Sequence, residues 1–193
     1  MTKDDIIALP NPHLRQKSQR VGLITSEIRQ IVDDMKAATL DWDASRKHEV
    51  GVALAAVQID RLYRIVIVRE DYNDKKNRDF TVFINPEITK LEGEIKADFE
   101  GCLSVPSIYG KVPRHTKVRV KALDLNGRQF RVTAEDFLAR IFQHEIDHTH
   151  GKVFIDHIRD DPAAFYRLGD DGKLLAIDYE KDIKNNADLW KKS

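Results

Sequence analysis

The segment from Gln143 to Gly151, QHEIDHTHG, contains side chains that could bind a metal ion. His144 and His148 are four residues apart, so on an α-helix they lie on one face, about 40° apart around the axis. Two imidazoles placed in this way can bind one metal, and Glu145 between them can handle the protons of a hydrolytic water. The pattern therefore favours a metal-dependent hydrolase over two histidines that only pack or face solvent.

The residues around this motif predict the helix that it requires. Residues 134–148 contain no Gly or Pro, and Phe137 and Ile141 fall in the same stripe as the two histidines. Thr133 is the expected N-cap, with Asp136 completing a variant of the capping box, and Gly151 is the expected stop. The histidines should thus continue an apolar stripe toward the core.

The composition limits the class of protein. A chain of 193 residues fits one domain with a sizeable core, and 32 Lys and Arg against 32 Asp and Glu give no sign of a nucleic-acid surface. No apolar run approaches the roughly 20 residues that a membrane span needs, and the N-terminus has no hydrophobic signal core. The single cysteine, Cys102, excludes an internal disulfide framework and suits a reducing compartment. We expect a soluble cytoplasmic protein that binds neither nucleic acid nor membrane.

The order of elements predicts an α+β fold. Residues 25–42 have helical spacing with Thr25 or Ser26 as the cap, and a polar loop is expected at 41–49. Five β-branched or alternating segments follow, separated by polar turns. They lie at 62–69, 80–85, 87–94, 117–125 and 129–133. We expect antiparallel β-sheets packed around the central helix that carries the HExxH motif, then a short strand at 153–155 and a solvated helix at 180–193.

A third metal ligand would decide the chemistry, and the residues alone leave two candidates. The extended motif HExxHxxGxxH is excluded because Phe154 occupies the position of its third histidine. A downstream carboxylate is one alternative, with Glu180 the nearest. Cys102 in the segment EGCLS is the other, since its thiolate would supply a charged ligand.

Three segments in this order resemble the motifs of the bacterial-type peptide deformylases: GVALAAVQ at 51–58, EGCLS at 100–104 and QHEIDH at 143–148. The resemblance extends over about residues 5–155 of a single catalytic domain, and it leaves 156–193 as a C-terminal extension of uncertain role. It implies a mixed α+β fold around the HExxH helix. The implied reaction removes the formyl group from N-formylmethionyl peptides and releases formate.

The resemblance also implies a role for each matching residue. Cys102, His144 and His148 would bind one divalent metal, with Fe²⁺ as the physiological ion and Zn²⁺, Ni²⁺ or Co²⁺ as substitutes. Glu145 would act as general base and then as general acid. The side-chain amide of Gln58 and the backbone N–H of Leu103 would stabilise the oxyanion. Newly made polypeptides would be the partners, with transient contact to the ribosome.

Substrate binding should involve the first two motifs and the metal helix. Val52, Phe137 and Ile141 are candidates for a methionine pocket. The peptide could add as a strand to Gly51, Val52 and Ala53 on one side and to Gly101 on the other. The family pattern has Gly where this chain has Ala53 and commonly Pro where it has Val57, and these departures bear on rate and specificity.

Two other classes of function compete with this interpretation. An HExxH peptidase with a downstream carboxylate would keep its metal without Cys102. A non-catalytic metal-binding or redox-sensing module would have no use for Glu145 and would need a fourth protein ligand.

Overall fold

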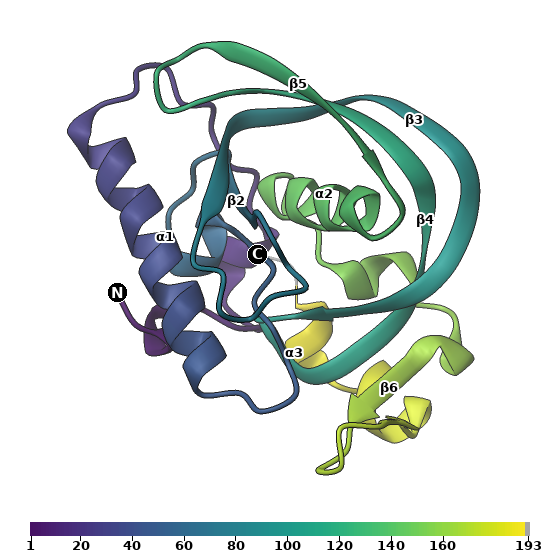
Figure 1. Ribbon diagram of the computed structural model, residues 1–193. Coiled ribbons are helices and arrows are strands. Elements are labelled where there is room, and N and C mark those ends of the chain that lie inside the picture. The colour runs from purple at the N-terminus through teal and green to yellow at the C-terminus, as the bar shows by residue number, and fades with distance from the viewer. Residues whose placement is uncertain (192–193) are drawn as a thin grey trace.

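The computed structural model describes residues 1–191 and shows two helices on opposite faces of a strongly curved sheet (Figure 1). Helix α1 spans Ser26–Ala44 and helix α2 spans Asp136–Thr149. The strands are β1 (Ala53–Ala55), β2 (Ile65–Arg69), β3 (Phe80–Cys102), β4 (Val105–Leu123), β5 (Gln129–Glu135), β6 (Phe165–Leu168) and β7 (Leu174–Ala176). This is the expected α+β fold, with the HExxH helix enclosed by antiparallel strands.

Within the described residues the strands form one antiparallel sheet in the order β1-β2-β3-β4-β6-β7, and β5 pairs with β4 beside this path. β3 is much longer than predicted because the segments at 80–85 and 87–94 are parts of one strand, and β4 begins at Val105, well before the predicted segment at 117–125. Register shifts interrupt their pairing at several points, and such bulges bend a strand pair. Figure 1 shows both strands arching around α2, so the curvature brings Cys102 at the end of β3 back toward that helix.

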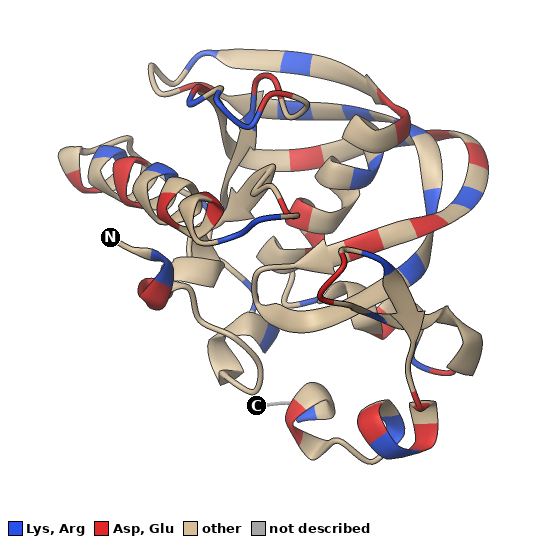
Figure 2. Cartoon of the chain, turned by 60° about the horizontal axis from the view of Figure 1, so that its bottom comes forward, with Lys and Arg blue, Asp and Glu red and all other residues tan. Residues whose placement is uncertain are grey.

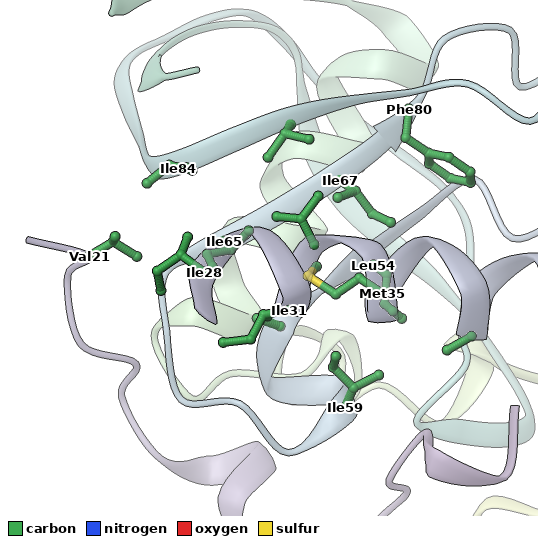
Figure 3. Close-up of a cluster of buried hydrophobic side chains, with 14 residues drawn as sticks. Val21, Ile28, Ile31, Met35, Leu54, Ile59, Ile65, Ile67, Phe80 and Ile84 are labelled. Carbon is green, nitrogen blue, oxygen red and sulfur yellow. The ribbon is translucent and has the colours of Figure 1, made fainter. Parts of the chain in front are cut away.

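β2 is buried on both faces, which fixes the layers of the fold. Its residues alternate between two apolar clusters, with Ile65 and Ile67 in the cluster under α1 and Val66 and Val68 in the cluster that contains α2 residues. Figure 3 shows the first cluster, in which side chains of β2 face Met35 and other residues of α1. A third cluster joins the start of β4 to the segment after α2 and to the C-terminal residues.

Both helices have boundaries that differ from the prediction. Thr25 does cap α1, since its hydroxyl accepts from the Ile28 N–H, but α1 continues to Ala44 into the stretch expected to be a loop. Thr133 is not the cap of α2. Strand β5 continues through Glu135, and the backbone turns directly into the helix at Asp136 with a φ of 49°. Pairing with β4 therefore overrides the local capping signal.

The C-terminal region differs more from the prediction. The expected strand at 153–155 is wrong, because the 3-10 helix Phe154–His157 lies there with Phe154 and Ile155 buried. The expected helix at 180–193 is divided into a π-helix, Tyr179–Lys184, and the short helix α3, Ala187–Trp190, and its last two residues lie outside the described part. Ile183 and Leu189 are buried in the third cluster, so this segment packs on the body of the protein.

Charged residues of both signs are interspersed along α1 and the long strands, as Figure 2 shows. None of the helices in residues 1–191 combines the length and the apolar character needed to cross a membrane.

Candidate metal centre and its surroundings

The structure brings Cys102 to the two histidines of the HExxH helix. The Cys102 Sγ lies 3.2 Å from the Nε2 of His148, and one potential ligand atom from each of Cys102, His144 and His148 falls within 4.8 Å of the others. The imidazole rings are 5.0 Å apart between centroids. Glu180, the rival third ligand, is exposed to solvent in the π-helix, where it pairs with Lys184.

Glu100 orients the His144 imidazole through its Nδ1. Its Oε2 lies 2.9 Å from the His144 Nδ1, so Nε2 is the ring nitrogen that remains for the centre. Burial alone would raise the pKa of Glu100, but His144 and Arg114 outweigh it and lower the pKa to about 2. A buried carboxylate that stays ionised here fixes the tautomer of a metal-binding histidine.

The two histidines of the centre have different electrostatic environments. Burial lowers the pKa of His148 to about 3, with the charge of His144 acting in the same direction, so His148 presents a neutral imidazole. Burial also disfavours a charged His144, yet its hydrogen bonds to Cys102 and Glu100 raise its pKa well above the ordinary value. Positive charge is therefore favoured at His144, beside the Glu100 carboxylate, and disfavoured at His148. One thiol and two imidazoles that converge in this way fit a divalent transition metal.

Glu145 is buried beside these residues, with its side-chain Oε2 bonded to no protein group. Burial raises its pKa to about 7, partly opposed by His144 and reinforced by the charge of Glu100. A carboxyl group with a pKa near neutrality can both accept and return a proton.

Gln58 reaches the centre from the first motif. Its Oε1 accepts from the Ala55 N–H at 2.9 Å, which orients the amide so that Nε2 donates toward the Cys102 Sγ at 3.5 Å and the Ser104 Oγ at 3.2 Å. Leu103, which follows Cys102, lies in the turn between β3 and β4 and packs against the first cluster. Both residues are thus close to the sulfur.

The predicted substrate residues occupy different environments. Ala53 lies in β1, where it pairs with Val68 of β2. Its φ is not positive, so its methyl group is compatible with the backbone there. Ile141 is buried in the second cluster and Val52 packs against it. Phe137 is 45% exposed, contacts Tyr72 edge to face, and lines a cavity of about 200 Å³. Charged side chains form most of the remaining wall of this cavity: Lys96, Asp98, Arg114, Asp136 and Arg140.

A largely buried network of charged side chains surrounds the centre. The Arg114 Nη1 donates to the Asp147 carboxylate at 2.6 Å, and His157 also contacts Asp147. Glu100 belongs to the EGCLS segment, but the sequence alone assigned it no function. It precedes Cys102 by two residues in a strand, which places both side chains on one face, and this spacing could have indicated it. Arg140 was also missed, although it lies one turn before His144 on the same helix.

An HExxH helix whose imidazoles meet a cysteine from a strand end, inside a curved antiparallel sheet, defines a metal-binding hydrolase of the α+β class. The chain belongs to the polypeptide deformylase family, whose model matches residues 3–163. The peptide deformylase of Thermomicrobium roseum is 44% identical over 164 residues, which cover 83% of this chain and 89% of that protein. That of Polynucleobacter necessarius is 40% identical over 153 residues, 79% and 84% of the two chains.

Solved structures give the same assignment. The chain resembles a peptide deformylase from Synechococcus elongatus in complex with actinonin, with a TM-score of 0.72 and 33% identity over 81% of this chain and 80% of that one. It also resembles a peptide deformylase from Legionella pneumophila, with a TM-score of 0.70 and 38% identity over 79% and 83% of the two chains. Strands β6 and β7 lie outside the family match.

Proposed function

We propose that this chain removes the formyl group from N-formylmethionyl peptides, with Cys102, His144 and His148 holding the required metal. The observation that carries the proposal is the convergence of the Cys102 thiol with both imidazoles of the HExxH helix, beside the buried carboxyl of Glu145. We infer Fe²⁺ as the physiological ion, with Zn²⁺, Ni²⁺ or Co²⁺ as substitutes. When bound, such an ion supplies Lewis acidity that activates water and polarises a carbonyl.

Glu145 is assigned the proton transfers. A formamide is a poor electrophile, and its nitrogen cannot leave as an amide anion. The carboxylate takes a proton from the attacking water and delivers it to the leaving nitrogen. Its raised pKa of about 7 supports both steps, because neither the charged nor the neutral form is strongly disfavoured near neutral pH.

Gln58 and the backbone N–H of Leu103 are assigned to the developing oxyanion. The Ala55 N–H holds the Gln58 amide so that its NH₂ group points toward the centre. A donor that is already in place needs little reorganisation when the oxyanion forms. Removing one such donor typically costs about 3 kcal/mol in the barrier. Gln58→Ala should therefore lower kcat by roughly 10²-fold.

The peptide is proposed to bind between the first two motifs. Within residues 1–191, β1 is at one end of the strand order and β3 near Gly101 pairs only with β4, so both segments have an edge available for strand addition. The segment Gly51, Val52 and Ala53 would bind one side of the peptide main chain. Phe137, Val52 and Ile141 would contact the methionine side chain. Newly made polypeptides imply action in the cytoplasm and transient contact with the ribosome.

The deciding experiment measures formate release from formyl-Met-Ala-Ser by anaerobically prepared, Fe²⁺-loaded protein. Glu145→Ala should keep the metal and lose activity, whereas Cys102→Ser should lose both. Unformylated Met-Ala-Ser serves as the control for peptide-bond hydrolysis. Folded, metal-replete protein that releases no formate would refute the proposal, and a Cys102→Ser variant that keeps its metal would favour the downstream-carboxylate peptidase.

A further inference from the structure

The carboxylate of Glu100 is held by hydrogen bonds on both oxygens. Its Oε1 accepts from the Arg114 Nε at 2.9 Å and from the Arg140 Nη1 at 2.8 Å. Its Oε2 accepts from the Arg114 Nη2 at 3.2 Å and lies 2.9 Å from the His144 Nδ1. Two arginines therefore fix the orientation of the Glu100 carboxylate relative to His144.

The two arginines have different further partners. Arg114 shares its Nη1 with Asp147 and His157, so it also joins β4 to the last turn of α2. Arg140 makes no ion pair other than that with Glu100 among the described residues. Its other hydrogen bonds go to backbone carbonyls, from Nη1 to Val112 O at 2.7 Å and from Nη2 to Lys96 O at 2.8 Å.

These backbone contacts make Arg140 a rigid support. The residue is 7% exposed, and its guanidinium is anchored at once to β3 through Lys96 and to β4 through Val112. A planar guanidinium fixed in this way directs its N–H groups at constant angles. Without Arg140, the Oε1 of Glu100 would keep one donor, and the carboxylate would be oriented by the two Arg114 hydrogen bonds and His144 alone.

We propose that Arg140 is a positioning residue of the metal centre, which holds Glu100 so that His144 directs its Nε2 toward Cys102 and His148. Because Arg140 precedes His144 by one helical turn, the same helix carries the ligand and the support for its orienting partner. The inference builds on the proposed metal centre but does not require that the substrate be a formylated peptide.

The test measures Co²⁺ binding to Arg140→Met and Arg140→Gln by competition with a chelator, together with the visible absorption spectrum of the Co²⁺-loaded protein. Loss of a group that orients a metal ligand typically weakens metal affinity by 10- to 100-fold. We expect this loss for Arg140→Met, with an altered spectrum. A smaller loss is expected for Arg140→Gln, because its amide can still donate a hydrogen bond.

Two controls separate positioning from general stability. Arg119→Met removes an exposed guanidinium that pairs with Glu92 and should change neither affinity nor spectrum. Arg69→Met removes a buried arginine that bonds Asp43 and Gly51, so it should destabilise the fold while leaving Co²⁺ affinity unchanged. Thermal unfolding of each variant shows whether the binding measurements were made on folded protein.

The proposal would be overturned if folded Arg140→Met bound Co²⁺ within twofold of the parent affinity and gave an identical spectrum. Arg140 would then serve only as a structural link between helix and sheet. If Arg140→Met does not fold, the same criterion applied to Arg140→Gln decides. A parent protein that binds Co²⁺ but releases no formate would refute the deformylase function alone. The response of Co²⁺ affinity to Arg140 would still be measurable in that protein.

Discussion

A buried ion pair between Asp43 and Arg69 fixes the start of the first motif, and its removal gives a quantitative test. The side chains are 6% and 0% exposed. The Asp43 Oδ1 accepts from the Gly51 N–H at 2.5 Å, and the Arg69 Nε donates to the Gly51 carbonyl at 3.1 Å. Both backbone polar groups of Gly51 are thus bonded to the pair.

Asp43→Ala should leave a buried guanidinium without its counter-charge and the Gly51 N–H without its acceptor. Breaking a buried pair in this way costs about 3–5 kcal/mol. Arg69 keeps carbonyl partners at Lys75 and Asn77, so we expect the lower end, about 3 kcal/mol. At roughly 2–4 °C per kcal/mol for a chain of this size, Tm should fall by about 6–12 °C.

Urea and thermal unfolding, followed by circular dichroism, would measure the loss, and Arg69→Met with the double variant would complete a mutant cycle. The double variant should be less destabilised than the sum of the single changes, since neither charge is then left unpaired. Glu92→Ala, which breaks surface ion pairs with Lys90 and Arg119, serves as the control and should cost much less than Asp43→Ala. A loss below about 1 kcal/mol for Asp43→Ala, or additivity within about 0.5 kcal/mol, would refute the reasoning.

Three further outcomes are expected. Burial and the hydrogen bond to Glu49 raise the pKa of Tyr109, so its stabilising contribution is full below the ordinary tyrosine pKa of about 10 and is lost as pH rises through the folded value. The fall of Tm above pH 10 should accordingly be shallower for Tyr109→Phe, and equal slopes would argue against the assignment. Ala53→Gly should hold or improve kcat/KM in the formate assay, whereas a large loss would show that the substrate binds differently. Phe154→Ala should cost about 3–5 kcal/mol in urea unfolding, because Phe154 is 1% exposed and stacks on His144, while a cost below 1 kcal/mol would mean that the site collapses around the missing ring.

Local spacing in the sequence was sufficient for the central helix and for two of the proposed ligands. The i and i+4 positions of His144 and His148 follow from helical geometry alone, and so does the Thr25 cap of α1. Alternating and β-branched runs indicated where strands lie, since a pleated strand exposes successive residues to opposite faces. Spacing did not identify Cys102 as the third ligand. The residues alone gave no preference between Cys102 and a downstream carboxylate, and the family resemblance distinguished the two.

Tertiary structure decided where elements end and which distant residues meet. Pairing with β4 extends β5 past Thr133, and burial of Phe154 and Ile155 in the third cluster replaces the predicted strand with a 3-10 turn. The contact between Arg140 and Glu100 depends on the curvature of β3 around α2, which arises from register shifts spread over the long strand pair. Such contacts join residues 40 positions apart. Short-range periodicity carries no information about them, because it is packing of the whole chain that brings the two side chains together.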